Sequence, residues 1–266
     1  MKKIILSIAV LVSVMSASCL RHDIKEAMKN AYENNIGSPF WDNVLFNVDK
    51  QDNVTDTLNL GRYDFSEVEI VGNASVVFSE SVDRVLVNRA NVFVQYKLFF
   101  DPSNKNRLVI QDNTNQNATI FIPANNNLEV IDLRDNADCV VQVERKDSRP
   151  LKIFMSGNSD LQAHINAPNV SIDAADESVI SLAGHVDKMS LKMDNNAGMD
   201  ASGLNVTDLA VELSDMSEAV VSCNKISGSL KDRTDLTTYG QSIDGSQLKV
   251  SKESKWSHKT YIEYEE

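Results

Sequence analysis

The stretch LKIFMSGNSDL at residues 151–161 contains the pattern that decides the fold of this chain. An alternating apolar segment leads into a small polar turn, and a second alternating segment follows it. The same order returns in VSIDAADESVI at 170–180, MSLKMDNNAGM at 189–199 and LAVELSDMSEA at 209–219. Alternation with a period of two is typical of β-strands, so each copy predicts two strands joined by a tight turn.

The copies recur at a nearly constant spacing. A small residue follows each turn, at positions 137, 159, 178, 197, 217 and 234, and the separations are 22, 19, 19, 20 and 17 residues. A repeat near 20 residues predicts a solenoid in which each coil stacks on the next. Leucine-rich repeats share this period, but they need a helical segment and a stacked Asn that these copies lack. We therefore predict an all-β parallel solenoid with alternate side chains in one axial core.

The predicted solenoid occupies residues 61–250. Alternation already begins in its first half, as in the pairs Val68 and Ile70, Leu108 and Ile110, and Ile120 and Ile122. Residues 251–266 are predicted to form a C-terminal cap or tail, because the open end of a solenoid needs covering. The aromatic residues in this segment allow a final strand, a cap or a glycan-binding platform.

The N-terminus predicts export. Lys2 and Lys3 precede an apolar run at 4–15, and small residues then lead to Cys19, so residues 1–18 are interpreted as a signal peptide. The run is too short for a comfortable bilayer crossing. Small residues directly before a cysteine resemble a bacterial lipobox, which predicts lipidation of Cys19 and an outer membrane lipoprotein facing the periplasm or the exterior. Ordinary cleavage before a free Cys19 and an uncleaved anchor helix are the alternatives.

Residues 19–60 are predicted to form a tether with a short helix. Ile24, Met28 and Ala31 follow helical spacing until the pair Ser38 and Pro39 interrupts it. The apolar residues at 40–46 favour either a small patch that caps the following domain or a spacer that holds the domain away from the membrane.

Composition narrows the classes of partner. The 266 residues contain 26 Lys+Arg against 38 Asp+Glu, a formal charge of −12, which disfavours binding to nucleic acid or anionic lipid. We expect a glycan or a surface protein as partner, with membrane contact only through the lipid anchor. The sequence predicts no oligomeric state. Cys139 and Cys223 would lie about four coils apart and are predicted to be buried thiols.

Two columns of acidic and amide residues form the predicted binding edge. One column stands two positions before each small residue and the other stands one position after it. Together the two columns contribute the residues of the predicted edge, which are Asp135, Asp138, Asp160, Asp176, Asn195, Asp215, Glu218, Asp232 and Asp235. No cofactor is expected unless Ca²⁺ binds these oxygens, with Asp135, Asp138, Asp215 and Glu218 as its ligands. The alternative is that the short side chains cap turn amides.

The sequence contains no catalytic signature. GxSxG, Walker A and GxGxxG motifs are missing, and the four histidines form no metal or triad spacing. We therefore expect no enzyme. A pectinase-like lyase or hydrolase is the first alternative, because two carboxylates at a suitable distance arise easily in such columns. A structural envelope protein is the second.

A family resemblance rests on FSEVEIVGNASVVF at 65–78, IFIP at 120–123 and the turn SGNS at 156–159. In order and pattern, residues 60–245 resemble the putative auto-transporter adhesin, head GIN domain family, exported proteins common in Bacteroidetes. The resemblance implies a fold similar to right-handed parallel β-helix proteins and an adhesive role at the cell surface. The Ser-Gly-Ser-Gly turns typical of that family are approached here only at 156–159.

Overall fold

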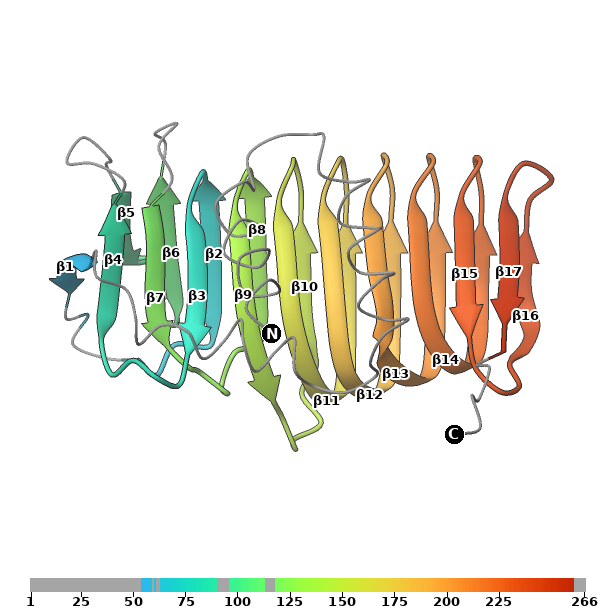
Figure 1. Cartoon of the computed structure of the whole chain (residues 1–266), viewed down its shortest axis with the longest axis horizontal. Coiled ribbons are helices and arrows are strands. Elements are labelled where there is room, and N and C mark those ends of the chain that lie inside the picture. The colour runs from blue at the N-terminus through green and yellow to red at the C-terminus, as the bar shows by residue number, and fades with distance from the viewer. Residues whose placement is uncertain (1–53, 59, 61–62, 90–95, 113–117, 261–266) are drawn as a thin grey trace, which may run out of the picture. The chain divides into compact units, whose positions relative to one another are not determined.

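The structure is a computed structural model, and it describes residues 54–58, 60, 63–89, 96–112 and 118–260. All regular elements in this part of the chain are β-strands (Figure 1). The predictions for residues 1–53, namely the signal peptide, Cys19 and the helical tether, fall outside the described residues. Within the described ranges no helix has the length and apolarity that a membrane crossing requires.

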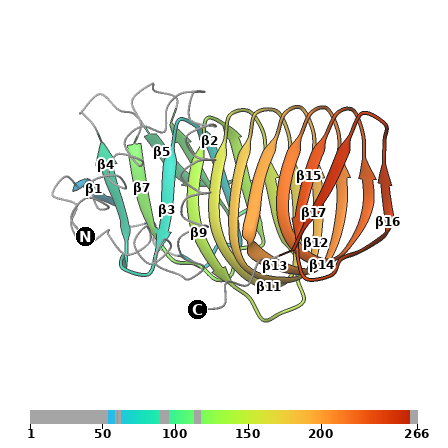
Figure 2. The same cartoon turned by 45° about the vertical axis from the view of Figure 1, so that its right-hand side comes forward.

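The strands form two walls that enclose the core (Figures 1 and 2). In ladder order, the front wall contains β1 (Val54–Leu58), β4 (Val85–Arg89), β7 (Ala118–Pro123), β3 (Ser75–Ser79), β9 (Asp138–Glu144), the first parts of β11 to β14, β15 (Asp235–Tyr239) and β17 (Lys255–Lys259). The back wall contains β5 (Tyr96–Phe100), β6 (Arg107–Asp112), β2 (Glu67–Gly72), β8 (Val130–Asp135), β10 (Leu151–Met155), the second parts of β11 to β14 and β16 (Asp244–Val250).

Four long strands bend from the front wall into the back wall. They are β11 (Asp160–Ala174), β12 (Val179–Met193), β13 (Gly198–Leu213) and β14 (Glu218–Leu230). The first part of β11 pairs with β9 and its second part with β10, both in parallel. Each coil therefore has a tight turn at one edge and a bend at the other, which confirms the predicted parallel β-solenoid over this part of the chain.

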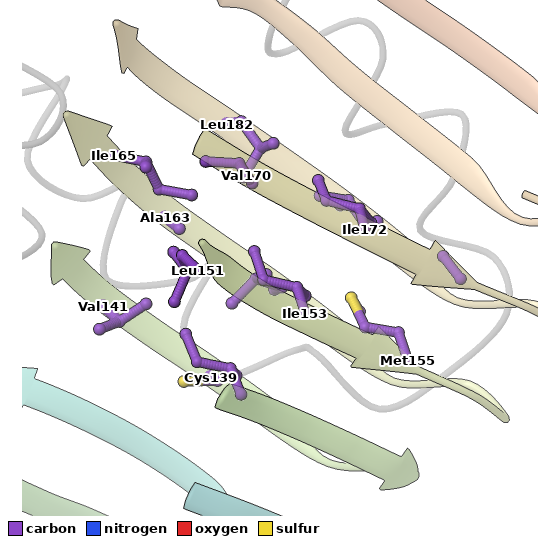
Figure 3. Packing of buried hydrophobic residues seen from close by; sticks show 14 of the residues in the cluster. Cys139, Val141, Leu151, Ile153, Met155, Ala163, Ile165, Val170, Ile172 and Leu182 are labelled. Carbon is purple, nitrogen blue, oxygen red and sulfur yellow. The ribbon is translucent and has the colours of Figure 1, made fainter. Parts of the chain in front are cut away.

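The core is one axial stack of alternate side chains, as predicted. Within one coil Leu151, Ile153, Ala163 and Ile165 are fully buried, and Met155 is nearly so (Figure 3). Removing an Ile or Leu side chain from water contributes roughly 1.5–3 kcal/mol. The small residues after the turns are buried as well, because the walls converge there.

The two thiols are far apart and unpaired. Cys139 on β9 and Cys223 on β14 are both buried and free. Four strand steps of ~4.8 Å separate these strands, whereas a disulfide needs Cα atoms within about 7 Å. The prediction of two buried thiols is confirmed, and burial raises the pKa of Cys223 to about 12.

The N-terminal end corrects the prediction of a wholly parallel stack from residue 61. β4 pairs antiparallel with β7 and with β1, and β5 pairs antiparallel with β6. The chain reverses over the short connection between β3 and β4, and a short connection cannot return a strand in parallel. β4 consequently opposes β7, which itself runs parallel to β3.

The stacking order also departs from the sequence order. The coil of β2 and β3 lies between the coil of β6 and β7 and the coil of β8 and β9. The connection from β7 to β8 runs past the coil of β2 and β3. Asn125 anchors this connection, because its buried Nδ2 donates to the carbonyl oxygen of Phe65 at 2.7 Å. At the other end, ladder pairing continues past residue 250 through β17.

Candidate binding surfaces

One predicted column forms the tight-turn edge of the stack. Asp135, Asp176, Asn195, Asp215 and Asp232 each begin a turn with a positive φ of 65°, 62°, 51°, 51° and 56°. Gly157 has the same place in its turn, with φ 72°. Asp, Asn and Gly tolerate this left-handed conformation better than other residues do. Backbone geometry therefore accounts for the residue types along this edge.

Hydrogen bonds connect neighbouring turns along this edge. The amide of Gly157 donates to Asp176 Oδ2 at 3.0 Å. A ladder of amide side chains adds to it, since Asn158 donates to Asn136 at 3.3 Å and Asn136 donates to Asn73 at 2.9 Å. These contacts support the turn-capping alternative for Asp176.

The second predicted column lies on the outside of the front wall and is interrupted. Asp138 and Asp160 are ladder neighbours, and Glu218 and Asp235 are another neighbouring pair. Val179 and Gly198 separate the two pairs. The nine predicted residues thus form a turn column and two wall pairs. In the described part of the chain, no three His, Cys, Asp or Glu side chains gather as a metal site would require.

The pair Asp138 and Asp160 has unusual electrostatics. Burial, together with the charge of Asp160, raises the pKa of Asp138 to about 8. Burial alone raises the pKa of Asp160 to about 7. At neutral pH the pair therefore retains protons that ordinary carboxylates have lost.

The bend edge contains a groove that the sequence analysis did not predict. It has a volume of about 410 Å³ and crosses four coils, where β11 to β14 enter the back wall. Two ladder rows line it. One row is Asn169, Lys188, Asp208 and Lys225, and the other is Ser171, Ser190, Ala210 and Ser227. The sequence signal was present in the recurrence of polar residues at one repeat position, away from the turns.

A structured loop borders one end of this groove. Pro150 lines the groove, and Asn169 Nδ2 donates to the carbonyl oxygen of Ser148 at 3.0 Å. Arg145 anchors the loop, because its nearly buried guanidinium donates to the carbonyl oxygen of Leu128 at 2.8 Å and to Asp147 at 2.7 Å. Hydrogen bonds from Arg149 and Arg145 lower the pKa of Asp147 to about 2.

A family model matches most of the β-strand stack. Residues 64–242 match the family described as "Putative auto-transporter adhesin, head GIN domain". The chain belongs to this family. The resemblance predicted from the sequence is therefore confirmed, and the solenoid with its groove is a head GIN domain. No curated protein matches the chain.

Solved structures support the fold of this head GIN domain. A putative adhesin from Bacteroides fragilis is 13% identical, with a TM-score of 0.59, covering 77% of this chain and 96% of its own. A putative adhesin from Parabacteroides merdae has 13% identity, a TM-score of 0.46 and coverages of 76% and 94%. A Parabacteroides distasonis structure described as a putative lipid binding protein has 15% identity, a TM-score of 0.45 and coverages of 74% and 96%. At sequence identities this low, structural similarity is evidence for the fold alone. Only the TM-score of the Bacteroides fragilis structure, 0.59, is high enough to support the fold.

Proposed function

We propose that this chain is a non-catalytic adhesin of the cell envelope and that its groove binds a glycan. The observation that carries the proposal is the pair of ladder rows crossing four coils, which are polar at every position except Ala210. Adjacent coils repeat hydroxyl, amide and charged groups every ~4.8 Å, which suits an extended chain of repeating polar units. The family description supplies the adhesive role.

The charged residues of the groove indicate which glycans it can bind. Lys188 and Lys225 flank Asp208, so these groove residues have a small positive excess on a chain of net charge −12. Lysine ammonium groups donate hydrogen bonds to hydroxyls and attract carboxylates. A neutral or weakly acidic polysaccharide fits this arrangement better than a strongly charged one.

Placement at the cell envelope is part of the proposal. The adhesin family indicates an exported protein. We infer that residues 1–18 are removed and that acylation of Cys19 anchors the protein to the outer membrane. Metabolic labelling with a radioactive fatty acid tests this, because Cys19→Ser should abolish the label while Cys139→Ser keeps it.

A glycan array with the purified protein tests the ligand, in Ca²⁺ and in EDTA. The groove variant Lys188→Ser/Lys225→Ser should bind at least tenfold more weakly. Lys231→Ser/Lys252→Ser is the matched control, because it removes the same charge from exposed positions outside the groove. Unchanged glycan binding by the groove variant would show that the groove is not the binding site. Loss of Ca²⁺-dependent binding in Asp135→Asn/Asp215→Asn would instead locate the ligand at the turn edge.

A carbohydrate-cleaving activity is the second candidate because of one observation. Glycoside cleavage uses paired carboxyl groups, one of them protonated, and Asp138 and Asp160 are neighbours with raised pKa values. Neither residue lines the groove. Mass analysis of the bound sugars should show intact chains if the adhesin proposal holds. Cleavage that is lost in Asp138→Asn would establish the enzyme.

A further inference from the structure

An exposed phenylalanine interrupts a polar row on the outer face of the back wall. Phe154 on β10 points outward, because its strand neighbours Ile153 and Met155 lie in the core, and it is 41% exposed. From β2 to β16 the other members of its ladder row are all charged or hydroxylated, namely Glu69, Asp132, Asp173, Lys192, Glu212, Ser229 and Lys249. The other coils therefore have a polar side chain at this position, and packing of the core does not account for Phe154.

Phe154 lies next to one end of the groove. The row of small residues in the groove begins at Ser171 on β11, and the ladder neighbour of Ser171 on β10 is Lys152. Lys152 and Phe154 are two positions apart on one strand, so both side chains project from the outer face, about 7 Å from each other along the strand. A ligand that leaves the groove along this row reaches Lys152 after one strand step of ~4.8 Å, beside the phenyl ring.

The charges around the ring leave Lys152 available to a ligand. Lys152 is exposed, and among the described residues no carboxylate lies within ion-pair distance of its ammonium group. The two carboxylates that neighbour Phe154 in its row already have partners. Asp132 pairs with Arg134 at 2.6 Å, and Asp173 pairs with Lys192 at 3.3 Å. The surface beside the ring can therefore accept a neutral or an acidic sugar.

We propose that Phe154 and Lys152 form a subsite for one pyranose unit, which extends the glycan site from the groove onto the back wall. The face of a phenyl ring carries negative charge density and attracts the weakly positive C–H groups on the flat face of a pyranose. The Lys152 ammonium group donates hydrogen bonds to the hydroxyl or carboxylate oxygens at the edge of the same sugar. The subsite rests on the proposed function, because it adds one strand to the groove.

Ligand length separates the subsite from the groove. The strands β11 to β14 are three steps, or about 14 Å, apart, and β10 adds a fourth step to give about 19 Å. Titration calorimetry with oligomers of glucose, mannose and galacturonic acid, from two to eight units long, measures this dependence. Phe154→Ala should bind the longest oligomers about tenfold more weakly than the parent and the shortest bound oligomers within twofold of it. Lys152→Ser should weaken the longest oligomers about threefold.

Two further kinds of variant control for surface apolarity. Phe99→Ala is the matched control, because Phe99 on β5 is 40% exposed and lies outside the groove, and it should change no affinity by more than twofold. Phe154→Trp should keep the affinity for long oligomers, since it retains an aromatic face. Phe154→Leu should lose it, because leucine is apolar without such a face. A thermal unfolding curve checks that the stack is folded in each variant.

The outcomes distinguish failure of the subsite from failure of the groove. If Phe154→Ala keeps its affinity for long oligomers while Lys188→Ser/Lys225→Ser weakens binding, the subsite is wrong and the groove proposal stands. An equal loss for short and long oligomers, or full binding by Phe154→Leu, would also overturn the subsite. If the parent binds none of the oligomers, the groove proposal fails and the subsite fails with it.

Discussion

At the residue scale, the positive φ at the start of each tight turn explains the Asp and Asn column. The sequence alone is compatible both with cation binding and with turn capping by these residues. Asp176 has φ 62° and accepts a hydrogen bond from the Gly157 amide, so its backbone and its side chain both serve the turn. The identity of the residue is thereby explained without a ligand.

Replacement of Asp176 tests this explanation. Asp176→Ala should lower the free energy of unfolding by about 1–2 kcal/mol, because alanine is strained in the left-handed region and the bond to Gly157 is lost. Asp176→Gly should cost less than Asp176→Ala, because glycine adopts this conformation without strain. Urea denaturation measures both. If the two variants are equally destabilised, backbone conformation is not the reason for Asp at this position.

The carboxyl pair on the front wall predicts a dependence of stability on pH. Asp138 and Asp160 have pKa values of about 8 and 7 in the fold, against an ordinary value of about 3.9 when unfolded. Between roughly pH 4 and pH 8 the native state holds more protons than the unfolded state, so this contribution falls as the pH rises. It is fully present below about pH 4.

Asp138→Asn should therefore be more stable than the parent at pH 8, by about 2 kcal/mol after allowance for solvent screening. The difference should shrink toward pH 4, where both forms are neutral at this position. Unfolding free energies measured at several pH values give the difference directly. A constant difference across this range would mean that Asp138 titrates normally.

At the element scale, two of the long strands contain glycines that lie against the backbone of a neighbouring coil. Gly228 on β14 has φ 121°, and a Cβ there would collide with the carbonyl oxygen of Val211 on the neighbouring coil. Gly184 on β12 meets the carbonyl oxygen of Ile165 in the same way. The coils approach each other at these points too closely for any side chain.

Two glycines in the same ladder system give a matched test. Gly228→Ala should lower the free energy of unfolding by about 3 kcal/mol or more, because strain at positive φ adds to a backbone collision. Gly198→Ala should change it by no more than about 0.5 kcal/mol, since nothing lies within 4 Å of its Cβ position. The denaturation midpoints of the two variants and the parent measure these differences. Equal effects would show that the coils separate readily at Gly228.

At the scale of the whole stack, the register predicts the behaviour of the two thiols. Cys139 and Cys223 lie on strands that are four steps, or about 19 Å, apart, and Cys223 is also shifted along its strand from the row of Cys139. Oxidant should not join them in the native state, and a maleimide should modify both only in denaturant. Intact-mass analysis of a Cys19→Ser chain measures this. An intramolecular disulfide in the folded protein would contradict the coil register.

The sequence by itself determined the solenoid, its period and its core. Residues such as Leu151 and Ile153 alternate locally, and a repeat of about 20 residues stacks equivalent positions, so both features can be deduced from neighbouring residues. The first residue of each turn was predictable for the same reason, because its positive φ favours Asp, Asn or Gly.

Only the tertiary structure decided the coil order, the groove and the burial of the acidic pair. Val68 pairs with both Leu108 and Ile131, so the β2 and β3 coil lies between strands that follow it in the chain. The groove similarly joins Asn169, Lys188 and Lys225 from separate coils. Periodicity identifies which residues face the core. It contains no information on which distant strands become neighbours, because that choice depends on packing between segments far apart in sequence.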